Sequence, residues 1–522
     1  MKRLNILLIL ILSSFLLPQC TKLDEQLRSE LDQTAKKDPA LLLTAAYTSM
    51  YGPYIQGNRW ALQEFSTDAA MAPTRGGDWD DNGTHRAIHL HTWNADNSYM
   101  NNTFVGLTTA AYQAAVVLEN SPNPQQAAEA RFIRALAIFD VIDLWGAFPY
   151  RDGEAMHNFK LDPKTLSTQE ALDFVAAELT AIIKDLPDVG PKIAATANKN
   201  AARFLLMKLY LNKSTFLNRQ APKFDKADMD KVVELGDSIT ASKLYTVSAP
   251  GKYFDNFAPN NNDVSTENIY TLLNDNGVRG GNVANTWAAV MHYNMWPGGN
   301  NGWCTLSDYY DKFNASDERR GIYYDYPADT TSNRAKSTYH RQNVGFFAGQ
   351  QYDWRTNVPL NARNPAGAPL IFTREVTIRT SGATLETAGI RVMKYAYDYK
   401  SVGQKNNDWV MFRYADALLM QAEAMLRGGK GSATQALALV NTIRANRGVS
   451  LALLPLTLDD ILDERARELY WEGWRRQDLI RFGKFLQPWQ EKPADPDPKT
   501  LLFPFPSQQL AVNPNLKQNP GY

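Results

Sequence analysis

The feature that most constrains the fold of this chain is the separation of two helix-rich stretches by a long stretch without helical periodicity. Apolar residues recur at helical spacing between about residues 38 and 245 and again between about 410 and 485, which predicts amphipathic helices in both stretches. Between about residues 250 and 408 the sequence is rich in Gly, Asn, Pro and Tyr, with only short β-like runs such as 376–378 and 390–392. Connections this long inside a compact protein are usually functional surfaces.

The helix-rich stretches predict the fold class. Small residues such as Ala415 and Ala422 on paired helices favour tetratricopeptide-like hairpins, although no strict sequence repeat is visible. We therefore predict a mainly α protein, with a tetratricopeptide-like helix-hairpin scaffold and long irregular loop-rich insertions. Helices are expected over 126–145, 168–186, 200–216, 225–241, 412–426, 434–446 and 457–482.

Charge, cysteine content and motifs exclude several classes of function. The chain has 55 Lys+Arg and 55 Asp+Glu, and this balance argues against a nucleic-acid binder, which needs a basic excess to hold phosphates. Its two cysteines, Cys20 and Cys304, exclude a disulfide framework and a multi-cysteine metal site. Serine-hydrolase, zinc-peptidase and phosphate-loop motifs are absent, so we assign no catalytic residue. A glycosidase pair of carboxylates stays open, because the distance that matters is spatial.

The N-terminus has the pattern of a targeting signal. Residues 1–19 contain a short basic start and an apolar run from Leu4 to Leu17. That run is too short for the roughly 30 Å hydrocarbon core of a bilayer and fits a secretory signal peptide. Cys20 follows in a sequence that resembles the lipobox of bacterial lipoproteins, whose cysteine carries the lipid. The alternative is a plain signal peptide with an incidental cysteine.

Two polar clusters are candidate metal sites. His85, His89 and His91 are close in sequence, but their spacing mixes helical and strand periods, which favours surface or packing roles. The run 78–83 resembles the start of a calcium loop, yet His89 stands at the twelfth position, where an EF-hand needs glutamate. We predict no metal ligand and no cofactor, and leave a structural calcium open.

Aromatic residues are concentrated in the segments without helical periodicity. Between Trp287 and Tyr310 six of 24 residues are Trp or Tyr, against 11% aromatic residues in the whole chain. Such a segment cannot bury every ring in its own core, so some rings are expected to face a ligand, and the others to be core residues. Flat rings stack on the C–H faces of sugars, and Asn, Asp and Arg bind hydroxyls. The candidate ligand-binding residues, taken from here and from two further polar-aromatic patches, are Arg75, Asp78, Trp79, Trp93, Asn94, Asn97, Tyr293, Trp296, Trp303, Tyr352 and Trp354.

Several distinctive sequence blocks are spread over nearly the whole chain, at 20–24, 67–68, 75–79, 130–149, 413–423, 441–444, 464–483, 503–506 and 513–522. Together these blocks resemble the SusD/RagB family, the starch-utilisation-type surface lipoproteins of Bacteroidetes. The resemblance implies a helical fold around tetratricopeptide-like units and a surface that binds glycans or other nutrients without cleaving them. It also implies a lipid-anchored position on the outer membrane at the cell surface. The implied partner is a SusC-like TonB-dependent transporter, to which captured oligosaccharide is delivered.

The expected organisation combines both lines of reasoning. A lipoprotein signal peptide over 1–19 precedes one SusD-like domain over 20–522, with Cys20 as its lipidation site. Within the domain we expect the helical scaffold at about 38–245 and 410–485, the ligand-binding insertion at about 250–408 and an extended C-terminal strap at about 490–522. Two other functions stay open: a surface glycoside hydrolase, and a non-ligand-binding scaffold subunit of the transporter complex.

Overall fold

The computed structural model describes residues 36–54, 56–158, 160–275, 284–325, 340–399, 406–495 and 497–522. The chain divides into residues 1–37 and a compact unit of residues 38–522. The predicted signal peptide and the predicted lipidation site, Cys20, lie outside the described residues. In the described part, every helix is too short or too polar to cross a bilayer.

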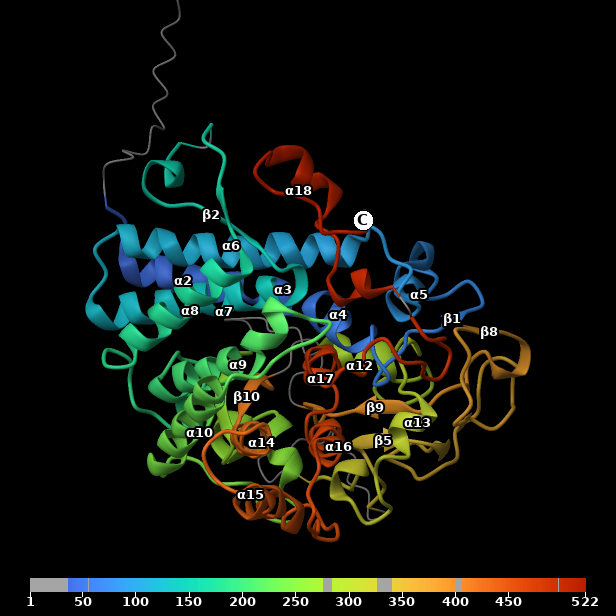
Figure 1. Ribbon diagram of the computed structural model, residues 1–522. Helices are drawn as coiled ribbons and strands as arrows, with labels where there is room; N and C mark the ends of the chain where they lie inside the picture. The colour runs from blue at the N-terminus through green and yellow to red at the C-terminus, as the bar shows by residue number, and fades with distance from the viewer. Residues whose placement is uncertain are drawn as a thin grey trace, which may run out of the picture. The chain divides into compact units, whose positions relative to one another are not determined.

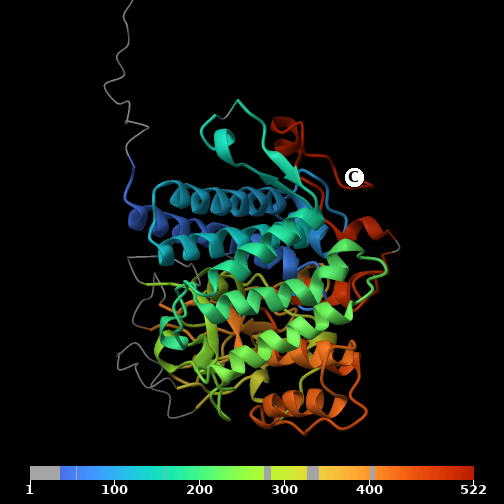
Figure 2. The ribbon, with the colours of Figure 1, turned by 60° about the vertical axis from the view of Figure 1, so that its left-hand side comes forward.

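Long helices that follow one another in the chain pack side by side in the N-terminal part of the compact unit (Figure 1, Figure 2). Helix α2 packs on α6, α6 packs on α7, α7 on α8, α8 on α9, and α9 on α10. These helices are α2 (Pro39–Ser49), α6 (Ser98–Glu119), α7 (Pro124–Trp145), α8 (Thr168–Ile182), α9 (Lys199–Leu217) and α10 (Lys226–Ala241).

A second group of helices completes the scaffold. Helix α14 packs on α10, α15 and α16, so the C-terminal helices join the N-terminal ones although some 170 residues separate them. The group comprises α14 (Tyr414–Leu426), α15 (Ala433–Ala445), α16 (Leu458–Glu468) and α17 (Arg475–Arg481). The predicted mainly α fold class is confirmed, whereas the tetratricopeptide-like character of the hairpins stays a prediction.

Side-chain caps set the ends of several helices. Asn123 and Ser167 each form a reciprocal capping box, at the starts of α7 and α8. Gly146 ends α7 in the left-handed conformation, with φ of 82°, which costs glycine little. The helices predicted at 126–145 and 200–216 are found within two residues of those bounds.

The single helix predicted over 457–482 is wrong in its middle part. The structure has two helices there, α16 and α17, and Trp471 (φ 58°) and Gly473 (φ 79°) between them take left-handed conformations. Tertiary hydrogen bonds hold this break: the Trp60 indole donates to the Trp471 carbonyl oxygen at 2.9 Å, and Arg59 donates to that of Gly473 at 3.0 Å. Helical periodicity cannot reveal contacts with a segment 400 residues away.

In its described residues, the region between the two helical groups contains short elements only. Its helices are α11 (Asn261–Val264), α12 (Ala284–Val290) and α13 (Ser307–Tyr310). Its 3-10 turns are η5 (Tyr253–Phe257), η6 (Glu318–Arg320) and η7 (Gly382–Thr384). The remaining short elements, outside this region, are α3 (Tyr51–Tyr54), η1 (Gln56–Trp60), α4 (Ala61–Glu64), η2 (Asp81–Gly83), α5 (Thr84–His89), η3 (Gly153–Met156), η4 (Pro191–Ile193), η8 (Pro498–Leu501) and α18 (Ser507–Val512).

The described strands form two-stranded ladders rather than one sheet. The antiparallel pairs are β2 (Phe148–Tyr150) with β3 (Lys164–Leu166), β4 (Asn268–Leu272) with β10 (Trp409–Arg413), β5 (Gly345–Phe347) with β9 (Arg391–Met393), and β6 (Gly349–Gln350) with β7 (Ile371–Phe372). Strand β1 (Thr74–Arg75) runs parallel to β8 (Arg379–Thr380). The β1–β8 pair and a bridge between Met71 and Cys304 bring three distant loops together.

Buried ion pairs fasten these loops to the helices. Glu468 of α16 accepts hydrogen bonds from Arg319, Arg413 and Arg447, all completely buried. Burial alone would raise the pKa of Glu468, but the charges of Arg447, Arg413 and Arg319 hold it well below its usual range. Because Arg319 belongs to η6 and Glu468 to α16, the pairs connect the irregular region with the scaffold.

The C-terminal segment lies along the end of α7. The Phe503 amide donates to the Leu144 carbonyl oxygen at 2.9 Å, and the Trp145 indole donates to that of Pro504 at 2.9 Å. Phe503 and Phe505 are buried. The segment is not extended throughout, because it includes the helical turns η8 and α18.

Candidate functional site

Two of the sequence patches proposed for ligand binding meet in space, together with a neighbouring loop. The Tyr293 hydroxyl donates to the Asp78 carboxylate at 3.2 Å, and the Trp79 indole donates to the Asn300 carbonyl oxygen at 2.9 Å. The side-chain amide of Asn294 donates to the backbone carbonyl oxygen of Asn361 at 2.8 Å. We call this surface the aromatic loop face and define it by Asp78, Trp79, Tyr293, Trp296, Arg355 and Arg363.

The three rings of this face are half-buried, and arginines contact two of them, Tyr293 and Trp296. The guanidinium of Arg363 lies 3.4 Å from the centroid of the Tyr293 ring, and that of Arg355 lies 4.9 Å from the Trp296 ring. Trp296 also stacks on Tyr399, with centroids 5.3 Å apart and planes 11° apart. Burial raises the pKa of Tyr293, and the nearby Asp78 raises it further, so its hydroxyl stays a hydrogen-bond donor at neutral pH. Each ring is therefore held in place while part of it stays exposed.

Trp79 is held against the backbone of a glycine. A Cβ atom at Gly302 would lie 2.3 Å from the Trp79 ring, so only glycine allows this approach. Trp79 itself has a φ of 59°, an unusual conformation for a large residue. The indole hydrogen bond to Asn300 fixes the same ring.

A buried carboxylate joins the loops beneath the face. Glu386 accepts hydrogen bonds from His292 Nε2 at 2.8 Å and from the Arg363 backbone amide at 2.7 Å. The backbone carbonyl oxygen of Glu386 accepts a hydrogen bond from the Asn301 side chain at 3.0 Å. Burial would raise the pKa of Glu386, but the Arg363 amide and His292 hold it below its usual range. Glu386 thus positions Tyr293 and Arg363 through their neighbouring backbone.

Three of the predicted candidates in the same loops are buried, so the structure corrects their proposed role. Trp303, 4% exposed, stacks on Trp60 with ring centroids 5.0 Å apart, and Trp354 is 5% exposed. The guanidinium of Arg75 is buried and donates to the carbonyl oxygens of Gly302, Leu385 and Ala388. Burial leaves these side chains no surface for a ligand. Tyr352 is half-buried, and Arg341 lies 3.4 Å from its ring centroid.

The candidates at 93–97 lie against the C-terminal segment. Trp93 is 6% exposed, and its indole donates to the Tyr522 hydroxyl at 2.6 Å. Asn97 is buried and caps α6. Asn94 is exposed, and its side chain accepts from the Asp96 amide, closing a local turn. These contacts are structural, and they correct the prediction that Trp93 and Asn97 bind a ligand.

The three clustered histidines are buried packing residues. His85 hydrogen-bonds with Tyr99, His89 with the Gln490 carbonyl oxygen and His91 with Asp495. Burial lowers the pKa of each to about 4. Over the described ranges, no group of three or more His, Cys, Asp or Glu side chains is arranged to hold a metal ion.

The candidates predicted from the sequence omit three residues of the arrangement: Arg355, which contacts Trp296, and Arg363 and Glu386. Arg363 lies in a loop with no aromatic neighbour in sequence, and Glu386 lies in a run of small polar residues. Only the spatial approach of Tyr293 and His292 reveals them, so no local pattern could have identified either.

Comparison with known proteins defines the class. Residues 251–522 match the SusD family, which is more than half of the chain, so the chain belongs to the SusD family. It is 27% identical over 428 residues to the starch-binding protein SusD of Bacteroides thetaiotaomicron, covering 76% of this chain and 73% of that protein. It is 24% identical over 463 residues to the SusD-like protein P25 of Formosa agariphila, covering 81% and 80%. The resemblance stated from the sequence is confirmed.

Solved structures share the fold. A SusD superfamily protein from Parabacteroides distasonis matches with a TM-score of 0.69 and 18% identity, over 93% of this chain and 98% of that chain. The surface glycan-binding protein A from Bacteroides thetaiotaomicron, solved with laminarihexaose, matches with a TM-score of 0.67 and 17% identity, over 92% and 98%. At these identities the similarity establishes the fold alone.

Proposed function

We propose that this protein is a cell-surface lipoprotein that binds an oligosaccharide at the aromatic loop face and delivers it to a SusC-like TonB-dependent outer-membrane transporter. Membership of the SusD family supports the role, as do a relative named for starch binding and a structural neighbour solved with laminarihexaose. The observation that carries the proposal is the contact of the Tyr293 hydroxyl with Asp78 beside Trp79, with the half-buried Trp296 ring further along the same loop and an arginine against each of the Tyr293 and Trp296 rings.

The geometry suits recognition of several sugar units. Each half-exposed ring offers a flat apolar surface for the C–H groups of a sugar, while Asp78 accepts hydrogen bonds from hydroxyls and the arginines donate to them. The rings are already fixed by Asn300, Tyr399 and Arg363, so little side-chain entropy is lost on binding. We expect affinities of about micromolar to millimolar.

We further propose that the bound glycan stays intact and that no cofactor takes part. Two of the proteins named above, the starch-binding protein SusD and the surface glycan-binding protein A, are named for binding, and the groups at the aromatic loop face suit binding. A surface glycoside hydrolase and a scaffold subunit without a ligand are the competing functions. Analysis of the products after incubation distinguishes a glycoside hydrolase from a binding protein, because a hydrolase shortens the glycan.

The proposed lipid anchor is tested separately from glycan binding. Lipidation at Cys20 would place the protein on the outer membrane through acyl chains. The Cys20→Ala variant is expected to leave the membrane fraction and to lose label from a radioactive fatty acid. A variant that stays in the membrane with its label retained would reject this anchor.

Isothermal titration with a glycan panel that includes starch and laminarin oligosaccharides tests the binding proposal. Tyr293→Ala and Trp296→Ala should each weaken binding at least about tenfold, a cost of ~1.4 kcal/mol. Tyr210→Ala on α9 is the matched control and should bind normally. If no glycan binds while another nutrient does, the carbohydrate proposal is rejected. Co-purification with a transporter without any ligand binding would favour the scaffold function.

A further inference from the structure

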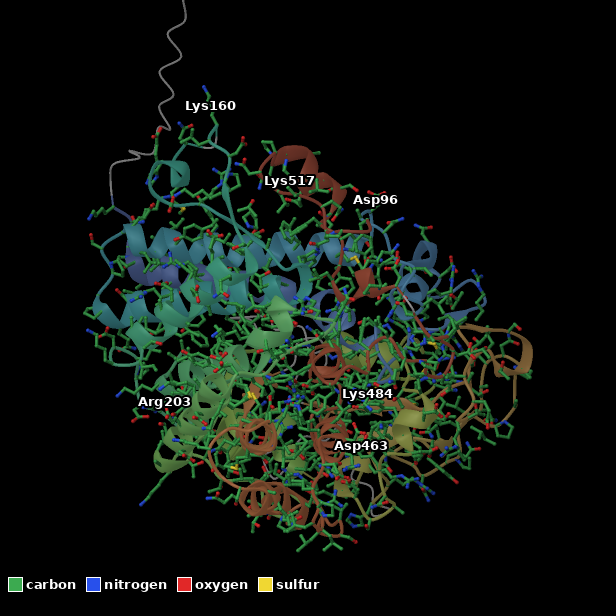
Figure 3. All side chains as sticks on the ribbon, in the orientation of Figure 1. Asp96, Lys160, Arg203, Asp463, Lys484 and Lys517 are labelled. Atoms are coloured by element: carbon green, nitrogen blue, oxygen red, sulfur yellow. The ribbon has the colours of Figure 1, made fainter. Side chains whose placement is uncertain are left out.

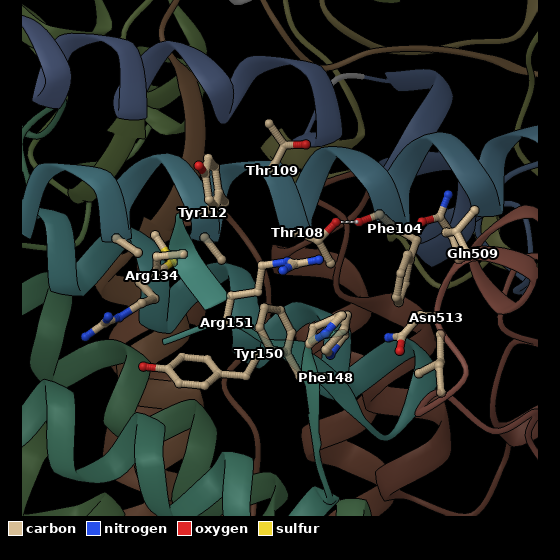
Figure 4. Close-up of a pocket in the computed structure, with 17 residues that line it drawn as sticks. Phe104, Thr108, Thr109, Tyr112, Arg134, Phe148, Tyr150, Arg151, Gln509 and Asn513 are labelled. Carbon is tan, nitrogen blue, oxygen red and sulfur yellow. Dashed lines mark hydrogen bonds between the residues drawn. The ribbon is translucent and has the colours of Figure 1, made fainter. Parts of the chain in front are cut away.

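A cavity of about 320 Å³ lies between α6, the β2–β3 hairpin and α18 (Figure 4). Its lining comes from distant parts of the chain, at 104–115, 134, 148–163 and 509–516, and contains no residue of the aromatic loop face. The volume is at the lower end of the range of roughly 300–1,000 Å³ for small-molecule sites. The cavity is therefore a separate feature of the molecule, with room for one small ligand.

The walls of the cavity are mostly apolar. Buried side chains form most of the wall; they are Phe104, Ala111, Ala115, Phe148, Met156 and Leu516. Val512, which also lines the cavity, is 70% exposed, so the apolar wall reaches the surface of the protein there. An apolar group that enters the cavity exchanges contact with water for contact with these side chains, which favours binding.

Both arginines in the wall already have oxygen partners. Arg134 shares the carboxylate of Glu178 with Arg131. Arg151 donates from Nη1 to the Leu161 carbonyl oxygen at 2.7 Å. A carboxylate in the cavity would have to displace or share these partners, and it would lose its hydration on entry, which is costly for an ion. The arginines therefore do not favour an anionic ligand.

The other charges nearby lie outside the wall. On the hairpin, Asp152 lies 3.3 Å from Lys164 Nζ. Lys160 and Lys517 are exposed on the same side of the molecule (Figure 3), and none of these four residues lines the cavity. Burial raises the pKa of Tyr150, which does line it, so the Tyr150 hydroxyl is uncharged at neutral pH. The lining therefore suits a neutral ligand.

A buried amide supplies a hydrogen-bond donor at the cavity. Asn513 follows α18, is 6% exposed and lines the cavity. Its Oδ1 accepts from the Asn515 backbone amide at 3.1 Å, which leaves the nitrogen Nδ2 as the other polar atom. Among the described residues Nδ2 has no acceptor, and Figure 4 shows it turned towards the other lining residues. It can donate a hydrogen bond to a carbonyl oxygen of a ligand.

We propose that this cavity binds a neutral aromatic compound that carries a carbonyl group, with the ring against Phe104 and Phe148 and the carbonyl oxygen on Asn513 Nδ2. The apolar wall selects the ring, the buried amide selects the carbonyl, and the partnered arginines disfavour an acid. The proposal does not depend on glycan binding at the aromatic loop face.

Isothermal titration with three related compounds tests the ligand class. Phenylpropionamide is neutral and has both ring and carbonyl, phenylpropionate has the same skeleton with a negative charge, and butyramide has the carbonyl without the ring. The full-length protein should bind phenylpropionamide with a Kd below about 1 mM. Phenylpropionate and butyramide should each bind at least about tenfold more weakly, because one is charged and the other has no ring to bury.

Two variants locate the binding at this cavity. Ala111→Phe places a ring in the space between the walls and should weaken phenylpropionamide binding at least about tenfold. Ala438→Phe, at an exposed position of α15, is its matched control. Asn513→Asp keeps the acceptor for Asn515 but removes the Nδ2 donor, and should weaken binding at least about threefold. Asn102→Asp, at an exposed position of α6, is the control for that change.

Several results would overturn the proposal. They are no binding of phenylpropionamide to the wild-type protein, equal or tighter binding of phenylpropionate or butyramide, and undiminished binding by Asn513→Asp or by a folded Ala111→Phe. Thermal unfolding shows whether each variant is folded, and Asn513→Asp decides the matter if Ala111→Phe is not. Failure of every protein to bind a glycan would bear on the proposed function alone.

Discussion

The aromatic loop face and the segment 93–97 contain the same types of residue in opposite environments. Both combine tryptophan with aspartate. At the loop face the Trp296 ring is half-exposed beside Arg355, whereas Trp93 is buried against Phe503, with ring centroids 4.7 Å apart. Composition therefore identifies segments rich in aromatic and polar residues. The side chains that pack against each segment decide whether its rings stay exposed to a ligand or become part of the core.

The largest expected effect separates a core ring from a surface ring seven residues away. Trp303→Ala should lower the free energy of unfolding by about 3–5 kcal/mol, because it leaves a cavity beside Trp60 and Phe65. Trp296→Ala should cost much less stability, since its ring is half-exposed. Urea unfolding of both variants measures the difference. Equal losses of unfolding free energy in the two variants would contradict the assignment of Trp303 to the core and of Trp296 to the surface.

The second-largest effect is expected at Glu386, the buried carboxylate beneath the aromatic loop face. Glu386→Ala removes the acceptor for His292 and the Arg363 amide, and should cost about 1–3 kcal/mol of stability. Glycan binding should weaken at least about tenfold, because Tyr293 and Arg363 lose their fixed geometry. Titration and thermal unfolding measure the two effects, with Glu375→Ala, an exposed carboxylate, as the control. Unchanged affinity would show that Glu386 does not position the face.

Acid pH should destabilise the segment 85–91 that lies between the two regions. Burial lowers the pKa of His85, His89 and His91 to about 4, against about 6.5 when unfolded. The unfolded state therefore binds more protons, so stability falls as pH drops from about 6.5 to about 4. Melting temperatures across this range measure the slope. His89→Gln should make the dependence shallower, and an unaltered slope would contradict the assignment.

The smallest effect is expected at the exposed residue of the segment 93–97. Asn94→Ala removes only a local turn contact to Asp96, so glycan affinity should stay within about twofold, a change of ~0.4 kcal/mol. Asp78→Ala, at the loop face, should weaken binding more, because Asp78 holds the Tyr293 hydroxyl. Isothermal titration of the two variants compares them directly. A larger loss in Asn94→Ala would place the ligand on the other segment.

The helices were predictable because their signals are local. The pattern at 126–145 includes the apolar stripe of α7, and Gly146 follows its end. The helix expected from residue 412 begins instead at Tyr414, because the preceding residues pair as β10 with β4. The break at Trp471 was missed for the same reason: a contact with a distant segment outweighs local propensity.

Part of the candidate site was predictable in the same way. An aromatic excess in loops pointed to Asp78, Trp79, Tyr293 and Trp296, which the fold brings together. It pointed equally to Trp93 and Trp303, which the fold buries. Arg363 and Glu386 left no pattern in the sequence, because the contacts of Arg363 with Tyr293 and of Glu386 with His292 join residues 70 or more positions apart.

Helix periods, caps and family blocks are properties of neighbouring residues, and they specified the mainly helical class and the family of this chain before any coordinates. The exposure of a ring depends on which distant side chains pack against it. Trp60 and Phe65 bury Trp303, while nothing comparable covers all of Trp296 in the described structure. Tertiary packing alone therefore decided which aromatic residues remain open to a ligand, because burial is a relation between segments and not a property of either one.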